Sequence, residues 1–350
     1  MLKSESSSQV LMVIFGAGAS WDSYERLPPP NVNNLRLPLA NGLFDSRFGN
    51  YYRLFPKCQP LIQRLQRQDV NVENVLEKFQ SEETRHPARR TQLVSVRYYL
   101  NLMLARCQYD WTDQVTKGVT NYQTLLDQIE AQRVQGEKIC LVTFNYDTLL
   151  EHAIIDSLVG VPLNTIPDYI SSDYKVIKPH GSINWGHPIR NFQSHRGNSQ
   201  DLISDIIASV ASLDVDAESY ETVSDDPFAR PHQRPYFPAL AIPVEHKQRY
   251  ECPQEHWKVL EDCLSQVTKV LIIGWRANEN DFLDTLVKGI TKKVRMMVVS
   301  GTERGADEVA ARISAKFRPT GIVHDFIQSK PGFSNFTSSS EWENFLKAEQ

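Results

Sequence analysis

Polar side chains that could transfer protons or bind a ribose lie in two short stretches of the chain. Thr143–Asp147 (TFNYD) places the carboxamide of Asn145 and the carboxylate of Asp147 directly after an apolar run. Lys178–Ser182 (KPHGS) places the imidazole of His180 between a proline and a glycine. A neutral imidazole can act as a general base near pH 7. The structural alternative is a helix cap at Asn145 or Asp147 and a packing role for the histidine.

A third stretch joins an apolar run to a turn of very small residues. Val10–Phe15 is followed by Gly16–Ser20 (GAGAS). A strand, a glycine turn and a helix N-terminus suit a dinucleotide pyrophosphate, because glycine allows close backbone approach and the helix offers free N–H groups. The usual fingerprint has a third glycine where this chain has Trp21, and no Walker-type Gly-Lys-Ser/Thr follows. A tight turn packed with small residues explains the stretch equally well.

Two further apolar runs end in turns of similar chemistry. Ile272–Asp281 (IIGWRANEND) passes through a glycine and then polar residues, and Val299–Thr302 (VSGT) ends another run. Ligands of open α/β sheets bind outside the carboxyl ends of the strands. Both turns are therefore candidates for contacts with a ribose, a phosphate or a base, while Asn278 or Asn280 as a helix cap is the structural alternative.

The elements that must position these turns alternate along the chain. Continuous apolar runs predict buried strands at Val10–Phe15, Ile139–Phe144, Val270–Gly274 and Val294–Val299, with weaker candidates at Tyr174–Lys178, Phe237–Pro243 and Ile322–Ile327. Helical patterns lie at Tyr146–Leu158, Pro253–Val267, Glu279–Ile290 and Ala306–Phe317. The alternation predicts an α/β, Rossmann-like fold: a mostly parallel sheet with helices on both faces, plus a helical insertion domain.

Two stretches interrupt this alternation. Residues 41–135 carry apolar side chains at helical spacing and predict the helical insertion. Residues 191–234 hold one helical pattern, Asp201–Leu213, followed by an acidic segment, and predict a flexible insertion or flap. Residues 1–40, 136–190 and 235–350 together would form the α/β domain.

Length, charge, cysteine content and hydropathy exclude several classes of protein. The chain has 350 residues, 41% of them hydrophobic, which suffices for a sizeable core. A formal charge of -4 indicates no direct nucleic-acid binding over the whole chain. Five cysteines without a C-x-x-C pair predict reduced thiols, no metal site and a cytoplasmic location. No apolar run is long enough to span a membrane.

In this order the motifs GAGAS, TFNYD, KPHGS and IGW with a downstream Asp resemble those of the sirtuin-like family. The resemblance is strongest to its bacterial branch of NAD hydrolases used in anti-phage defence. The motifs cover little of the chain, but their combination is far more specific than any one of them. The resemblance implies that the α/β residues form a sirtuin-type NAD-binding domain.

The resemblance also implies roles for individual residues. Asn145 would lie near the nicotinamide ribose, Asp147 would hold the nicotinamide end, and His180 would be the catalytic histidine. The implied cofactor-binding residues are Gly16, Ala17, Gly18, Ser20, Gly274, Asp281 and Ser300.

Two departures from deacetylating sirtuins separate this chain from a peptide deacetylase. Trp21–Pro30 contains no Gly-Ile-Pro-Asp-Phe-Arg-like segment, and the cysteines cannot form a four-cysteine zinc ribbon. The resemblance therefore implies an NAD glycohydrolase with NAD as its substrate and no metal. An NAD-dependent protein deacylase and a non-catalytic NAD- or ADP-ribose-binding regulatory module remain as alternatives.

The resemblance also implies how such an activity is controlled. An unregulated NAD hydrolase would kill its host. A homo-oligomer is therefore expected, with a HerA-type ATPase, a short Argonaute or a phage protein as the trigger.

Overall fold

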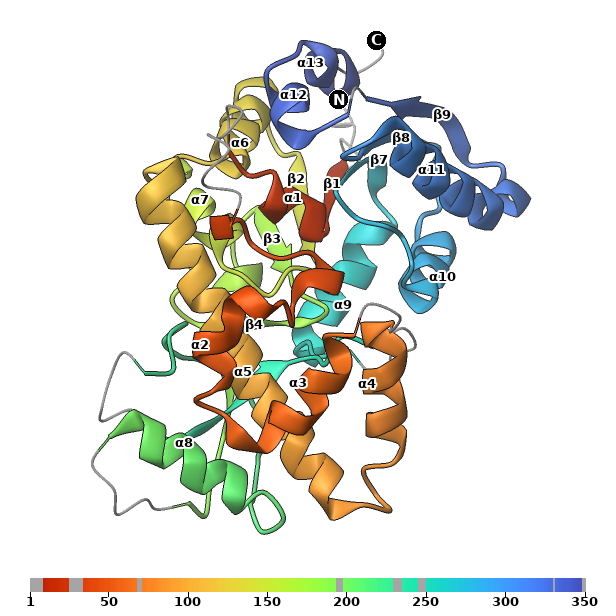
Figure 1. Ribbon diagram of the computed structural model, residues 1–350. Helices are drawn as coiled ribbons and strands as arrows, with labels where there is room; N and C mark the ends of the chain where they lie inside the picture. Colours follow the sequence, from red (N-terminus) through yellow and green to blue (C-terminus); the bar gives the residue numbers. More distant parts are fainter. Residues whose placement is uncertain are drawn as a thin grey trace.

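A six-stranded sheet forms the centre of the α/β part of the molecule (Figure 1). The computed structural model describes residues 9–24, 34–67, 71–192, 198–228, 235–244, 250–329 and 331–347. The strands are β1 (Val10–Phe15), β2 (Lys138–Thr143), β3 (Tyr174–Ile177), β7 (Val267–Ile273), β8 (Val294–Val299) and β9 (Val323–Gln328). Their order is β3-β2-β1-β7-β8-β9, and each neighbouring pair is parallel.

This strand order confirms the predicted α/β, Rossmann-like class. Numbered by their occurrence within the sheet, the strands lie in the order 3-2-1-4-5-6, that of doubly wound nucleotide-binding sheets. The direction of winding reverses between β1 and β7. In such sheets the ligand crevice lies at this reversal, outside the carboxyl ends of the strands. The turn after β1 and the loop after β7 therefore meet where a ligand is expected.

Both faces of the sheet are buried. Leu11, Val13 and Phe15 point to one face of β1 and the residues between them to the other. The first face is covered by α6 (Asn121–Gln132), α7 (Leu149–Ser157), α12 (Phe333–Thr337) and α13 (Glu341–Leu346). The second is covered by α9 (Gln254–Leu264), α10 (Asn280–Gly289) and α11 (Glu303–Phe317). This double covering explains why the strands are continuous apolar runs rather than alternating ones.

Helices fill the sequence between β1 and β2. They are α1 (Ala17–Trp21), α2 (Gly49–Tyr52), α3 (Gln59–Leu65), α4 (Val72–Ser81), α5 (Pro87–Trp111) and α6, with a π-helical turn at Thr112–Thr116. Helix α5 has 25 residues and runs through the lower half of the molecule between α2, α3, α4 and α8 (Figure 1). Short 3-10 helices lie at Ala40–Gly42, Ser46–Phe48, Pro56–Cys58, Ile166–Ile170 and Arg318–Thr320.

A second, antiparallel sheet packs against α5. It contains β4 (Gly181–Pro188), β5 (Glu221–Thr222) and β6 (Tyr236–Leu240) in the order β5-β4-β6. The predicted strand Phe237–Pro243 corresponds to β6 and belongs to this sheet, whereas β4 was not predicted. Asn101 of α5 donates to the carbonyl of Ile183 on β4 at 2.6 Å. The long helix and the second sheet therefore form one packed unit beside the main sheet.

The stretch 191–234, predicted as a flexible insertion or flap, contains a helix and a short strand within its described residues 191–192 and 198–228. Helix α8 (Ser199–Ala208) is shorter than the predicted Asp201–Leu213 pattern, and β5 lies in the acidic segment. Arg106 of α5 forms a 2.7 Å ion pair with Asp226 of that segment. Residues 193–197 and 229–234 lie outside the described residues. In the described part of the chain, no helix is both long and apolar enough to cross a membrane.

A buried ion pair joins the end of β3 to α7. The side chain of Lys178 is fully buried, and its Nζ donates to Glu151 Oε1 at 2.7 Å and to the Asp147 carbonyl at 2.6 Å. Tyr169 Oη lies 3.4 Å from the same Glu151 oxygen. A buried charge is tolerated only when it is paired and hydrogen-bonded. This lysine therefore holds the strand end, the loop after β2 and α7 in one arrangement.

Replacing Lys178 alone should leave the carboxylate of Glu151 buried without an opposite charge. We expect Lys178→Met to lower the free energy of unfolding by about 3–5 kcal/mol, measured by urea denaturation. The double variant Lys178→Met, Glu151→Leu should recover much of this loss, because an apolar pair carries no desolvation penalty. If the double variant is as unstable as the single one, the unpaired Glu151 carboxylate is not the cause of the lost stability.

Candidate functional site

The turn after β1 contacts the backbone of the loop after β7. A Cβ atom on Gly16 would lie 2.5 Å from the Cα of Trp275, and one on Gly18 would lie 2.9 Å from the Cα of Gly274. Gly274 itself has φ +64°, and its carbonyl accepts from the Gly18 N–H at 3.1 Å. Contacts between two backbones thus require the glycines at all three positions, and the packing explanation of the glycine turn accounts for them.

Asn145 reaches across from the end of β2 to this turn. Its Nδ2 lies 2.8 Å from Ser20 Oγ, 3.0 Å from the Gly16 carbonyl and 3.1 Å from Tyr122 Oη. The side chain is 4% exposed, and its Oδ1 is buried without a hydrogen-bond partner among the described residues. Ser20 Oγ and Tyr122 Oη are also within 2.9 Å of each other. One amide thus joins two of the predicted motifs and presents a buried acceptor.

The Asp147 carboxylate accepts a hydrogen bond at the start of helix α7. Its Oδ1 accepts from the backbone N–H of Leu149, the first residue of α7, at 3.2 Å. Burial raises the pKa of the Asp147 carboxyl, and the charge of Lys178 opposes this shift. The N-cap of α7 is Thr148, so neither Asn145 nor Asp147 is the cap itself; the Asp147 carboxylate binds the first N–H of the helix, while Asn145 is directed to the glycine turn.

His180 lies in an aromatic setting at the start of β4. The side chain is 8% exposed, and its ring meets Phe144 edge-on with centroids 4.9 Å apart. The ring of Tyr146 is 6.1 Å away, and Nε2 lies 3.9 Å from Glu279 Oε1. The imidazole thus contacts the rings of Phe144 and Tyr146, the two residues that flank Asn145 in the chain.

The backbone around His180 is held from the other side by the segment before α9. Gly181 has φ +77°, and a Cβ there would lie 1.9 Å from the Ala239 carbonyl oxygen. Ala241 N–H donates to the His180 carbonyl at 2.9 Å, and Glu251 N–H donates to the Pro179 carbonyl at 2.9 Å. Glycine is therefore obligatory directly after the histidine, and these two backbone hydrogen bonds fix the conformation of the turn.

Glu251 is the centre of a charged network behind this turn. Its Oε1 lies 2.8 Å from His187 Nε2 and accepts from Tyr220 Oη at 3.2 Å, and Arg97 lies 3.4 Å from Oε2. Burial alone would raise the pKa of the Glu251 carboxyl, but the hydrogen bond from His187 and the charge of Arg97 outweigh it and lower that pKa. The sequence singled out none of these residues, because they come from distant parts of the chain.

The remaining predicted residues are spread along the sheet edge. Ala17 begins α1, and Asp281 is exposed in the first turn of α10. Ser300 follows β8, where its carbonyl accepts from the Gly332 N–H at 2.7 Å. The structure thus joins Gly16, Ser20 and Asn145 by hydrogen bonds, whereas His180 contacts Phe144, Tyr146 and Glu279.

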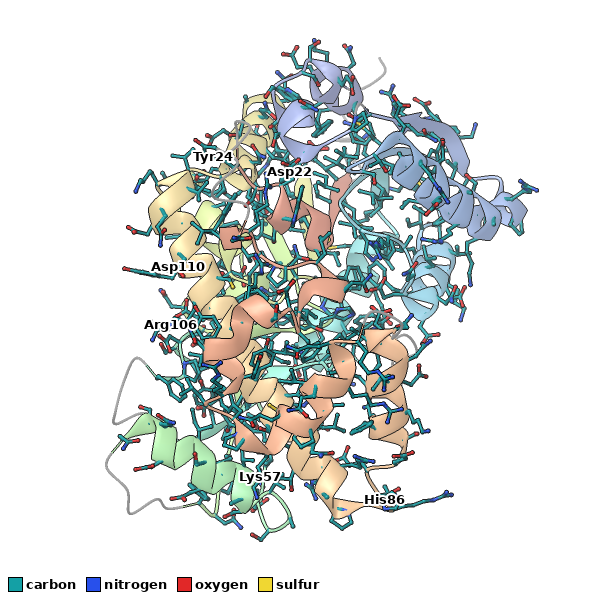
Figure 2. All side chains as sticks on the ribbon, viewed as in Figure 1. Asp22, Tyr24, Lys57, His86, Arg106 and Asp110 are labelled. Carbon is teal, nitrogen blue, oxygen red and sulfur yellow. The ribbon has the colours of Figure 1, made fainter. Side chains whose placement is uncertain are left out.

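The C-terminal segment closes over the glycine turn. Ser334 Oγ lies 2.8 Å from Asp22 Oδ1 and 2.7 Å from the Tyr24 carbonyl, and Figure 2 labels both of these residues near α1. The ring of Phe333 lies 5.6 Å from that of Tyr122. Tyr122 of α6, which was not predicted, is therefore buried between the site and the C-terminal helices. Nothing in the sequence distinguishes this tyrosine from other core aromatics.

Side chains that bind metal ions do not cluster in the described part of the chain. No group of three or more His, Cys, Asp or Glu side chains there could hold a metal ion. All five cysteines are free thiols.

Comparisons with known proteins find likeness to solved sirtuin structures. No protein-family model and no curated protein matches the chain. A structure solved to explain sirtuin substrate affinity is 13% identical with a TM-score of 0.39, and covers 97% of this chain and 95% of its own. Sir2 with a p53 peptide and NAD+ is 13% identical with a TM-score of 0.38, over the same shares of the two chains. Sir2Tm bound to a propionylated peptide is 12% identical with a TM-score of 0.40, again over 97% and 95%.

The close backbone contact predicts a stability effect without any ligand. Gly16→Ala should lower the free energy of unfolding by about 1–3 kcal/mol, because its new methyl group meets backbone that cannot rotate away. Gly301→Ala is the matched control, since a Cβ there meets no atom within 4 Å, and it should stay within about 0.5 kcal/mol of wild type. Thermal and urea denaturation of the ligand-free protein measure both. Unchanged stability of Gly16→Ala would assign the glycine to a ligand alone.

The Glu251 network predicts a pH-dependent contribution to stability. The folded-state pKa of Glu251 is lowered, so its contribution is fully present above the unfolded value of about 4.3 and is lost as pH falls through the folded pKa. Glu251→Gln should therefore destabilise most at pH 6–7, by about 3 kcal/mol, and the difference from wild type should shrink below about pH 4. Glu261→Gln on the exposed face of α9 is the control. A pH-independent difference would contradict the assignment.

Proposed function

We propose that this chain is an NAD hydrolase that cleaves the nicotinamide–ribose bond and releases nicotinamide and ADP-ribose. The observation that carries the proposal is the position of Asn145. Its buried amide joins the glycine turn to the end of β2 at the reversal point of the sheet, and its chain neighbours Phe144 and Tyr146 contact the ring of His180. The resemblance of the motifs, in their order along the chain, supports NAD as the nucleotide.

The residues of the site suit different parts of NAD. Asn145 and Ser20 offer amide and hydroxyl groups for the ribose next to the nicotinamide. Within the glycine turn, the N–H groups of Gly16 and Gly18 already donate to the carbonyls of Ile273 and Gly274. We therefore assign these glycines, with Ala17 and Gly274, to the shape of the pyrophosphate site rather than to donation. Asp281 and Ser300 would contact the adenosine half.

The chemistry follows from the charge of the substrate. The nicotinamide ring is cationic and leaves as a neutral base, taking the electron pair of the C–N bond, while positive charge develops on the ribose. The protein must hold the ribose, stabilise that charge and deliver water. In our assignment His180 accepts the proton of the attacking water or polarises a ribose hydroxyl, and Asn145 orients the water or the ribose. Asp147 would hold the carboxamide or stabilise the cationic sugar.

The biological role that we propose is NAD depletion in anti-phage defence in the cytoplasm. Such an activity must be silent until it is needed. Residues 41–135 would form a helical domain that supplies contacts for a homo-oligomer, and residues 191–234 would form a regulatory insertion. The trigger would be a HerA-type ATPase, a short Argonaute or a phage protein. This part of the proposal rests on the resemblance of the motifs.

Chromatography of NAD incubated with the purified protein tests the activity. We expect nicotinamide and ADP-ribose from the wild type, and a loss of at least about 100-fold in His180→Ala and Asn145→Ala. His324→Ala, which removes an exposed histidine on β9, should keep full activity. Full activity in both site variants would refute the assignment.

A parallel reaction containing an acetylated peptide separates the alternatives. Product release only with the peptide, with acetyl transferred to ADP-ribose, would identify a deacylase. Calorimetric binding of NAD or ADP-ribose with no turnover, including after addition of the candidate triggers, would identify a binding module.

A further inference from the structure

Glu279 lies near the proposed catalytic histidine and comes from the loop between β7 and α10. Its Oε1 lies 3.9 Å from His180 Nε2, and its Oε2 accepts from the indole N–H of Trp275 at 2.7 Å. The Trp275 ring stacks on Phe144 with centroids 5.2 Å apart and an angle of 2°. Phe144 in turn meets the His180 ring edge-on. One block of aromatic rings therefore sets the positions of both the carboxylate and the imidazole.

The loop that carries Glu279 has an unusual backbone. Besides Gly274, Ala277 adopts a positive φ of +55°, although it is a buried non-glycine residue. Such a conformation costs about 1–2 kcal/mol, and strained residues of this kind cluster at functional sites. The carbonyl of Arg276 is held by Arg312 of α11 at 2.6 Å. The surrounding structure thus maintains a strained loop, which brings Glu279 back toward His180.

Helix capping does not explain the side chain of Glu279. The residue occupies the N-cap position of α10, but its side chain makes no capping hydrogen bond. A carboxylate at that position could accept from the free N–H groups of the first turn. Instead it is directed to Trp275 and His180.

We propose that Glu279 is the positioning residue of His180. The carboxylate orients the imidazole and stabilises the imidazolium that forms when His180 accepts a proton, because an opposite charge within about 4–6 Å favours the charged form. The reaction in which this occurs rests on the proposed function, whereas the pairing itself does not. Other ionisable groups near His180 or Glu279 include Lys178, Tyr146 and Asp147 on one side, Tyr250 and Asp281 beside Glu279, Glu73 near Tyr146, and Glu251 with Arg97 behind the turn.

The kinetic test compares Glu279→Gln with Glu279→Asp. Glutamine can still accept from Trp275 but carries no charge, so we expect kcat for NAD cleavage to fall about 10–100-fold with KM changed less than about 3-fold. The aspartate variant should recover part of kcat. In a His180→Ala background, Glu279→Gln should have no further effect, because the carboxylate acts through the histidine. A further loss in that background would show that Glu279 acts directly on the substrate and would overturn the proposal.

A second test does not depend on turnover. In protein labelled with ¹⁵N-histidine, the His180 ring signals are identified by their loss in His180→Ala and followed by NMR across pH 5–9. Removing the carboxylate in Glu279→Gln should lower the pH of half-protonation of this imidazole by about 0.5–1 unit, and Glu261→Gln should leave it unchanged. An unchanged midpoint in Glu279→Gln refutes the pairing even if the protein cleaves NAD. A lowered midpoint in a protein that never cleaves NAD would support the pairing and refute the proposed function.

Discussion

The contact between the backbone of Gly16–Gly18 and that of Gly274–Trp275 is the constraint on which the site depends. No side chain fits between the two segments, so the turn after β1 and the loop after β7 are held at van der Waals distance. This contact places Ser20 within reach of Asn145 on one side and Trp275 against Phe144 on the other. A displacement of either segment would therefore move the Asn145 amide, and the Glu279 carboxylate that lies near His180. The close packing of two backbones thus fixes the relative positions of the glycine turn, the loop after β7 and the segment after β2.

Buried polar groups add a second constraint, because each must find a partner. The Lys178 ammonium group is hydrogen-bonded to Glu151 of α7 and to the Asp147 carbonyl. These bonds fix the position of the loop after β2 relative to the end of β3. Tyr122 of α6 meets the hydroxyl of Ser20, and Arg97 of α5 meets Glu251. The helices between β1 and β2 therefore contribute polar contacts to the site itself, in addition to their apolar packing around it.

The sequence predicted the main sheet well because of how its strands are buried. With both faces covered, β1, β2, β7 and β8 contain continuous apolar runs, and a glycine follows β1 and β7 and a serine follows β8, whereas the edge strand β9 (VHDFIQ) is only partly buried. Strand β4 escaped prediction because Gly181–Pro188 is rich in small and polar residues, and its burial is decided by α5 and the second sheet. Asn145 and His180 could be found since each lies in the turn that follows a strand. Glu279 lies in the singled-out turn 272–281, but its approach to His180 was not predicted, and Tyr122 and Glu251 could not be found, because only the folded chain brings these residues together.

The glycine turn illustrates why one motif seldom identifies a ligand. Its glycines are required by a contact within the protein, and the N–H groups of Gly16 and Gly18 are already engaged by neighbouring carbonyls. The turn therefore specifies the geometry of the crevice but offers little of the hydrogen bonding that would choose an occupant. That choice falls to the side chains around it, namely the unpaired Asn145 oxygen, the His180 imidazole and the Glu279 carboxylate near that imidazole. A chain that kept the glycines but lost these groups would keep the fold without the chemistry.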